Sequence, residues 1–372
     1  MPYSGTVPTT LLIKGENVNE SANSKELQNL AELLVDSFEA YGIAISVDSI
    51  KPTPSINRFE ISIARGTRIS EVISLKRDIQ MLMKLTSIGI EAPIPWTSHI
   101  AIDIPKAHKV TPRLRNLLDN EEFINASETS LALGSNTSNV PLLFDIAKHQ
   151  HLLITGSDTR DLEEARNSIV VSMLCKARYH NVKMLMIDPA DRTTCVFDGI
   201  PHLLMPVATS YQDVIDTINY ATNELNRRIK IMAKESVKSI DHTVKKYPHI
   251  VIFINAIDEL LHYAPHDTYY NLYQLVSKGA YAGMHLIISN GINLRSNAFL
   301  MLNDRIRNKV VFRTNTVEQS QRVIYHDGAE FLTGNGDMYY YDRPTNLCIR
   351  SNSPLVTPIE IDDATKWLKE NH

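Results

Sequence analysis

Five short apolar runs recur between residues 151 and 314, and helical patterns lie between most of them. The runs read HLLIT, VKMLMID, HIVIFIN, MHLIIS and KVVFRT. Strands that are apolar on both faces are typical of parallel sheets that helices cover on both sides. This pattern therefore predicts an α/β domain built on a parallel sheet.

The first third of the chain has a different pattern. Residues 1–24 are polar and rich in Asn and Ser, so we expect a flexible tail there. A helical pattern that stops at Gly42 is followed by two alternating strands, a second amphipathic helix and a strand near residues 99–105. This order predicts a small α+β domain, to which we assign residues 25–125. Residues 126–372 are then left for the α/β domain.

The composition excludes several classes of protein. With 43% hydrophobic and 22% charged residues the chain is ordinary for a globular protein, and its net charge of −4 gives no overall basic field. The three cysteines form no CxxC pair, so neither a metal site nor a disulfide framework is predicted. The sequence has no long apolar run and no signal peptide, which favours a cytoplasmic location.

The stretch HLLITGSDTRDLE, residues 151–163, has the layout of a phosphate-binding strand, loop and helix. A GxxxxGK[ST] loop uses glycines to turn backbone N–H groups toward the phosphates, a lysine to reach them and a hydroxyl to hold Mg²⁺. Counted from Gly156, the last three of these places hold Asp161, Leu162 and Glu163. Leucine donates no hydrogen bond and carboxylates repel a triphosphate, so we predict no bound nucleotide and no other cofactor.

The second catalytic element of such motors is an apolar strand that ends in Asp-Glu. Here the strand HIVIFIN ends in Asn255, and Ala256 follows it. Asp258 and Glu259 come one helical turn later. We expect them to point away from the site and to serve as first-turn acids of a helix.

Several longer stretches carry a family resemblance. MIDPADRTTCVFDGIPHLLMPV, NELNRRIKIM, AGMHLIIS and GAEFLTGNGDMYY resemble motifs of the FtsK/SpoIIIE family of double-stranded DNA translocases. INRFEISIARGTRISEVISLKRDI resembles the small alpha domain that precedes the motor in that family. The resemblance covers roughly residues 25–372 and implies a RecA-like motor domain, of P-loop type, that forms hexameric rings. From the end of the sequence we expect no counterpart of the family's C-terminal winged-helix domain.

In the register of that family, the departures fall on the nucleotide site. Leucine and glutamate replace the lysine and the hydroxyl, asparagine and alanine replace the Asp-Glu pair, and the TQRP stretch after the next strand is replaced from Asn290 onward. The vestigial positions are Gly156, Asp161, Leu162, Glu163, Asn255, Ala256 and Asn290. Taken together, these replacements predict a pseudo-ATPase that keeps the fold and is not an enzyme.

A ring of this fold would hold duplex DNA through lysine and arginine side chains that contact phosphates. We predict a homo-oligomer that binds double-stranded DNA as a clamp or scaffold without ATP-driven translocation. The candidate contacts are Arg227, Arg228, Lys230, Lys245, Lys246, Arg305, Arg307 and Lys309. For each of these residues the competing interpretation is a solvated helix face or an ion pair.

Two other functions stay open. In the first, the chain is a protein-binding regulator or accessory subunit that co-assembles with an active DNA motor or another replicon protein and does not touch DNA. Its net acidity favours this alternative. In the second, the chain is a DNA translocase with an unorthodox nucleotide site, built from hydroxyls and a cation near the loop at Thr155, Ser157, Thr159 and Arg160. The carboxylates that crowd the same place argue against it.

Overall fold

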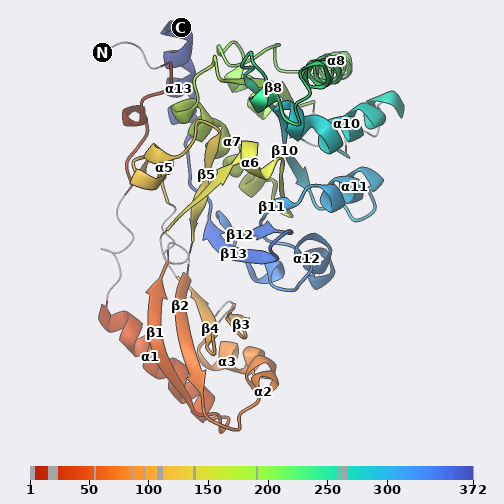
Figure 1. The fold of residues 1–372 in the computed structure, drawn as a ribbon. Helices are drawn as coiled ribbons and strands as arrows, with labels where there is room; N and C mark the ends of the chain where they lie inside the picture. The colour runs from red at the N-terminus through yellow and green to blue at the C-terminus, as the bar shows by residue number, and fades with distance from the viewer. Residues whose placement is uncertain are drawn as a thin grey trace.

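The protein consists of two domains stacked end to end, as the ribbon in Figure 1 shows. The structure is a computed structural model, and it describes residues 5–15, 24–53, 56–85, 87–94, 97–106, 112–136, 140–189, 192–255, 257–258, 260 and 266–371. Among the helices of these residues, none combines the length and the apolar character needed to cross a membrane.

The small domain is an antiparallel sheet with helices packed on it. Its strands are β1 (Ile45–Pro52), β2 (Ile56–Ile63), β3 (Gly89–Glu91) and β4 (Ile100–Pro105), in the order β1-β2-β4-β3. Its helices are α1 (Ser24–Glu39), α2 (Ile69–Ser74) and α3 (Lys76–Leu82). Phe38 of α1 meets Phe59 and Ile102 of the sheet in one buried cluster, so the predicted α+β character is confirmed.

The large domain contains a nine-stranded sheet in the order β6-β5-β13-β12-β11-β7-β10-β9-β8. Five neighbouring strands are parallel: β11 (Asn308–Val311), β7 (Leu152–Gly156), β10 (Met284–Gly291), β9 (His249–Asn255) and β8 (Val182–Ile187). The other four are antiparallel: β5 (Ser130–Asn136), β6 (Pro141–Asp145), β12 (Asp337–Asp342) and β13 (Leu347–Asn352). The predicted α/β class is confirmed. The sheet is mixed, however, and the five apolar runs form only its parallel part.

Helices cover both faces of the large sheet. One buried cluster joins Ile154 of β7 to α7 (Thr159–Lys176) and α13 (Pro358–Glu370), while Leu153, the preceding residue, lies in a second cluster with α8 (Tyr211–Glu235) and α10 (His266–Lys278). Successive side chains of a strand point to opposite faces, which explains why neighbouring residues of one strand enter different clusters. Other helices in the described part of this domain are α6 (Ile146–His149), α11 (Asn297–Arg305), α12 (Val317–Ile324), η3 (Thr193–Phe197), η4 (Ile240–His242), η5 (Gly279–Ala282) and η6 (Ala329–Phe331).

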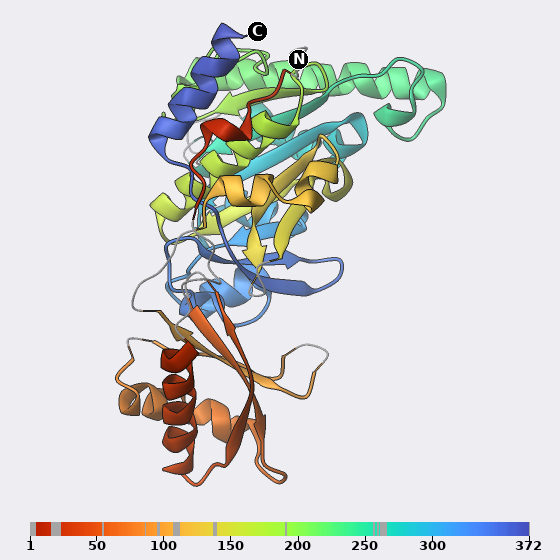
Figure 2. The ribbon, with the colours of Figure 1, turned by 90° about the vertical axis from the view of Figure 1, so that its left-hand side faces the viewer.

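Two segments that the sequence assigned elsewhere belong to the large domain. Leu114 and Phe123, on α4 (Leu114–Leu118) and α5 (Glu121–Asn125), lie in the cluster of α7 rather than in the small domain. Residues 5–15, expected within a flexible tail, carry the 3₁₀ helix η1 (Thr9–Leu11) along the large domain (Figure 2). Val7 is buried there, and its amide donates to the carbonyl oxygen of Leu174 at 2.9 Å.

The outer edge of β8 is covered by a segment of the same chain. The amide of Met184 donates to His202 O at 2.8 Å, and the amide of Leu204 donates back to Met184 O at 3.0 Å. Farther along, Ala208 N donates to Met186 O at 2.9 Å. Residues 202–208 therefore use the backbone groups that an edge strand would otherwise expose.

Candidate functional site

The positions expected at a nucleotide site come together at one edge of the parallel sheet. Gly156, Asn255 and Gly291 end β7, β9 and β10, and the strand register pairs Gly156 with Gly291 and Asn255 with Ser289. The carboxyl ends of parallel strands are where α/β proteins bind their ligands. The predicted grouping of Gly156, Asn255 and Asn290 thus corresponds to a real edge of the sheet.

The loop after β7 is short. Only Ser157 and Asp158 separate Gly156 from α7, because the helix begins at Thr159. Asp158 caps it: its Oδ1 accepts from the amide of Arg160 at 2.9 Å, as is typical of an N-cap aspartate. The amide of Ser157 donates to the carbonyl oxygen of Arg313 at 2.9 Å. The wide loop whose amides would surround phosphates is therefore replaced by the helix and by a contact with the segment that follows β11.

The residues at the lysine and hydroxyl places do not fit a triphosphate. Leu162 is 5% exposed and belongs to the apolar cluster beneath α7, while Glu163 is half-buried. Asp161 is 2% exposed, and burial raises the pKa of its carboxyl despite a hydrogen bond from the amide of Gly336 at 3.0 Å. Burial and the nearby Asp161 likewise raise the pKa of Glu164. These side chains offer a phosphate no cation.

Asn255 has a structural role at the end of β9. Its Nδ2 donates to Asp188 Oδ1 at 2.9 Å, and the other oxygen of Asp188 accepts from the amide and hydroxyl of Thr194 at 2.9 and 3.0 Å. Although burial alone would raise the pKa of Asp188, these hydrogen bonds hold it below its usual range. Ala256, the other position of the pair, lies outside the described residues.

Asp258 is a site residue that the sequence interpretation placed wrongly. Its Oδ2 accepts from Asn290 Nδ2 at 3.1 Å, and its Oδ1 accepts from the hydroxyl of Ser296. The carboxylate therefore faces the end of β10 instead of pointing away. Its position three residues after an apolar strand was the available signal. Glu259 lies outside the described residues.

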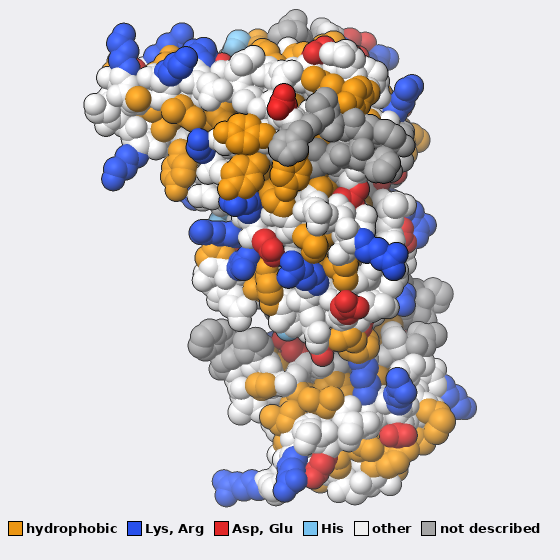
Figure 3. Space-filling model, turned by 90° about the vertical axis from the view of Figure 1, so that its right-hand side faces the viewer, with side chains coloured by type: hydrophobic (Ala, Val, Ile, Leu, Met, Phe, Trp, Pro, Cys, Tyr) orange, Lys and Arg blue, Asp and Glu red, His pale blue; other side chains and the backbone are white. Residues whose placement is uncertain are grey.

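The basic candidates lie at the opposite edge of the sheet. Lys245 and Lys246 precede β9, Arg305 and Arg307 precede β11, and α8 runs back from the end of β8 toward the start of β9. On the face drawn in Figure 3, lysine and arginine side chains gather along the upper left edge and across the middle of the large domain. Six candidates are exposed: Arg227, Lys230, Lys245, Lys246, Arg305 and Arg307.

Arg228 and Lys309 are not DNA contacts, contrary to the prediction. Arg228 is 1% exposed, and its guanidinium donates to the carbonyl oxygens of Ala282 and Pro248 at 2.8 and 2.9 Å. Lys309 is 0% exposed, with Nζ 2.8 Å from Asn303 Oδ1. Burial lowers the pKa of Lys309 to about 7. Both side chains hold elements of the domain together, and neither can reach a phosphate outside.

Some of the exposed candidates have partners within the chain. Arg227 forms a two-point contact with Glu224, at 2.6 and 2.8 Å. The guanidinium of Arg305 lies 4.2 Å from the centre of the Tyr273 ring and donates to its hydroxyl. Contacts of exposed side chains are worth little in water, so these residues remain available to a phosphate.

Three features together define a motor-type ATPase fold. The mixed sheet has helices on both faces, its parallel strands end at a polar edge, and a small α+β domain precedes it. The FtsK/SpoIIIE family model matches residues 113–304, and the model of the FtsK alpha domain matches residues 7–106. The chain belongs to the FtsK/SpoIIIE family.

Curated relatives align with nearly the whole chain. The DNA translocase FtsK of Caldanaerobacter subterraneus subsp. tengcongensis is 30% identical over 374 residues, which cover 99% of this chain and 53% of the relative. The DNA translocase FtsK of Clostridium acetobutylicum is 29% identical, with 95% and 48% covered. The chain therefore spans about half the length of these relatives.

Solved structures support the fold. The pCW3 conjugation coupling protein TcpA superposes with a TM-score of 0.57 at 14% identity, covering 92% of this chain and 99% of TcpA. The cytoplasmic domain of the type VII secretion ATPase EccC from Thermomonospora curvata gives 0.58 at 16% identity, covering 70% of this chain and 34% of EccC. At these identities the likeness concerns the fold alone.

These comparisons correct the prediction that the chain is not an enzyme. Relatives named DNA translocase FtsK align with 99% and 95% of this chain, and their family is one of ATPases. The replacements at Leu162, Glu163 and Asn255 describe how this chain differs at the nucleotide edge. They do not place it outside that enzyme family.

Proposed function

We propose that the chain is a subunit of an oligomeric ring that acts on double-stranded DNA in the cytoplasm. The observation that carries this proposal is the gathering of six exposed lysine and arginine residues at the amino-terminal edge of the parallel strands, in a chain whose net charge is −4. A local basic surface on an acidic protein is the arrangement that binds a polyanion at one place only.

The two edges of the sheet would then have separate roles. Lys245 precedes β9, which ends at Asn255. Arg307 precedes β11, whose last residue, Val311, pairs with Thr155 of β7. A duplex held at the basic edge would therefore not compete with whatever occupies the carboxyl-terminal edge. Both domains align in order with DNA translocases, which supports DNA as the ligand.

A second candidate is co-assembly with a motor of the same family without direct DNA contact. Tyr220 of α8, Tyr270 of α10 and Tyr281 of η5 are all exposed. Tyrosine is enriched at protein interfaces because its ring supplies apolar area and its hydroxyl a hydrogen bond. This surface favours contact with a further subunit.

The deciding experiment is fluorescence anisotropy of a labelled duplex at about 50 and 200 mM salt, with and without Mg-ATP. We compare the wild type with the triple variant Lys230→Gln, Lys245→Gln, Arg307→Gln. Arg160→Gln, exposed at the opposite edge, is the matched control. The triple variant should bind about tenfold or more weakly, and its salt slope should fall by about 0.9 for each phosphate that it no longer neutralises.

Equal weakening of duplex binding in Arg160→Gln would mean that the DNA binds at the carboxyl-terminal edge instead. Absence of salt-sensitive binding in the wild type would overturn the DNA proposal and favour co-assembly. Native mass spectrometry with and without duplex tests whether the chain forms a ring. A strictly monomeric chain in both samples would exclude a ring.

A further inference from the structure

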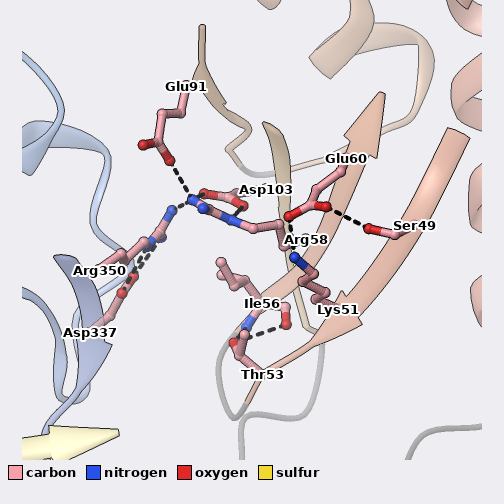
Figure 4. Close-up of polar contacts among 10 residues, drawn as sticks. All are labelled: Ser49, Lys51, Thr53, Ile56, Arg58, Glu60, Glu91, Asp103, Asp337 and Arg350. Carbon is pink, nitrogen blue, oxygen red and sulfur yellow. Dashed lines mark hydrogen bonds and ion pairs between the residues drawn. The ribbon is translucent and has the colours of Figure 1, made fainter. Parts of the chain in front are cut away.

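The boundary between the two domains contains a buried arginine shared by two carboxylates (Figure 4). Arg350 of β13 donates to Asp337 of β12 through Nε at 3.0 Å and Nη2 at 2.7 Å. Its Nη1 donates to Asp103 of β4, in the small domain. All three side chains are buried, and charge-assisted bonds of this kind are strong and direction-specific.

The small domain continues this network. Arg58 of β2 donates to Asp103 through Nε at 2.8 Å and Nη2 at 3.0 Å, and also to Glu91 of β3 at 2.8 Å. Burial alone would raise the pKa of Asp103, but Arg350 and Arg58 hold it below its usual range. Gly89 makes room: a Cβ there would lie 3.1 Å from Asp103 Cβ and 3.5 Å from an Nη atom of Arg350.

The same network also reaches the first turn of α7 in the large domain. Asp337 Oδ2 also accepts from the amide and hydroxyl of Thr333, at 2.8 and 3.0 Å. One residue before it, the amide of Gly336 donates to Asp161 Oδ1 at 3.0 Å. The turn at residues 333–337 is thus bonded to α7 through Gly336 and to Arg350 through Asp337, the next residue.

Asp161 occupies the place where a GxxxxGK loop has its second glycine, and a glycine would have no side chain to reach the turn. We propose that Asp161 is a positioning residue that couples the beginning of α7 to the small domain, through the turn at 333–337, Arg350 and Asp103. In this chain Asp161, at the place of the second glycine of a phosphate loop, thus helps to hold the small domain in place on the large domain. The inference is independent of DNA binding, because no basic candidate takes part in it.

Hydrogen exchange tests this coupling. Asp161→Ala removes the acceptor of the Gly336 amide, Asp161→Asn keeps an acceptor oxygen, and Glu163→Ala on the same helical turn is the matched control. We expect Asp161→Ala to speed exchange roughly threefold or more both in residues 333–340 and in β3 and β4, more than 50 residues away in sequence from α7. Asp161→Asn should restore protection, and Glu163→Ala should leave it unchanged.

Faster exchange confined to residues 333–340, or none, would overturn the proposal. Where Asp161→Ala does not fold, a double-mutant cycle of Asp161→Ser, whose hydroxyl lies one bond short of the Oδ1 that accepts from Gly336, and Asp103→Asn in urea unfolding decides. Coupled residues give a double variant whose loss of stability differs from the sum of the two single losses. Additive losses would show that the two carboxylates act independently and would also overturn it.

Discussion

Arg350 in β13 donates a hydrogen bond to Asp103 in β4 across 247 residues of sequence, and this contact joins the two domains. Replacing the arginine with methionine leaves Asp103 and Asp337 buried with fewer partners. We expect Arg350→Met to lower the free energy of unfolding by about 3–5 kcal/mol in urea titrations, the cost of breaking a buried pair. Lys366→Met, which breaks the exposed pair with Glu370, should cost less than about 1 kcal/mol. Similar losses in the two variants would contradict this interpretation.

Gly156 should not tolerate a side chain. A Cβ at this position would lie 2.7 Å from Phe312 Cβ, whereas at Gly291, its partner in the register of β7 and β10, a Cβ meets nothing within 4 Å among the described residues. Gly156→Ala should therefore lower the midpoint of thermal unfolding, at a cost of about 1–3 kcal/mol. Gly291→Ala is the control and should cost less. Equal stability of the two variants would mean that β7 and β11 can move apart easily.

Two buried histidines should make the protein sensitive to acid. His151 accepts from the amide of Leu286 through Nδ1 and contacts Val276 O through Nε2, both at 3.0 Å, while His285 Nδ1 lies 2.8 Å from Gln150 O. Burial lowers the pKa of His151 to about 4 and that of His285 to about 3.

Because these two folded-state pKa values are depressed, their contribution to stability is complete above about pH 6.5, where the unfolded chain is also neutral. It is lost as the pH falls from there toward 4, at up to about 1.4 kcal/mol per pH unit for each histidine. His151→Gln should reduce the slope of unfolding free energy against pH between 6.5 and 4.5. The exposed His180→Gln should keep the wild-type slope, and a wild-type slope in both variants would rule out this origin.

Arg307 and Lys309 lie two positions apart and should behave differently toward DNA. Arg307 is exposed, whereas Lys309 is enclosed by Asn303 and the carbonyl oxygen of Val323. Arg307→Gln should weaken duplex binding and reduce its salt slope by about 0.9. Lys309→Met should change stability but leave the salt slope as it is. A reduced slope for Lys309→Met, in a variant with native circular dichroism, would contradict its structural role.

Local patterns were sufficient to predict most of the fold. The five apolar runs are the five parallel strands, and alternating residues marked β1 and β2 of the small domain, whereas β3 was not predicted. The four antiparallel strands were not predicted as part of the sheet. One reason is visible in β5, where Gly134 interrupts the apolar pattern. A Cβ at Gly134 would lie 2.3 Å from Asn352 O, so the close approach of β13 leaves no room for a side chain there.

The candidate site was only partly predictable. Counting along the chain located Asp161 and Leu162, but the acceptor role of Asp161 depends on Gly336, 175 residues away. Arg228 could have been recognised as buried, because Leu225 and Met232 place it on the apolar face of α8 at helical spacing. Lys309 gave no such signal, since a charged residue inside a sheet becomes acceptable only through partners that the fold brings to it.

The covered edge of β8 affects how copies of the chain meet at high concentration. A bare strand edge is a template onto which another polypeptide can extend the sheet, and such additions tend to be irreversible. Here an approaching chain would first have to displace residues 202–208 from Met184 and Met186. Encounters at this edge are therefore restricted to side-chain contacts, which separate again readily and do not extend the sheet.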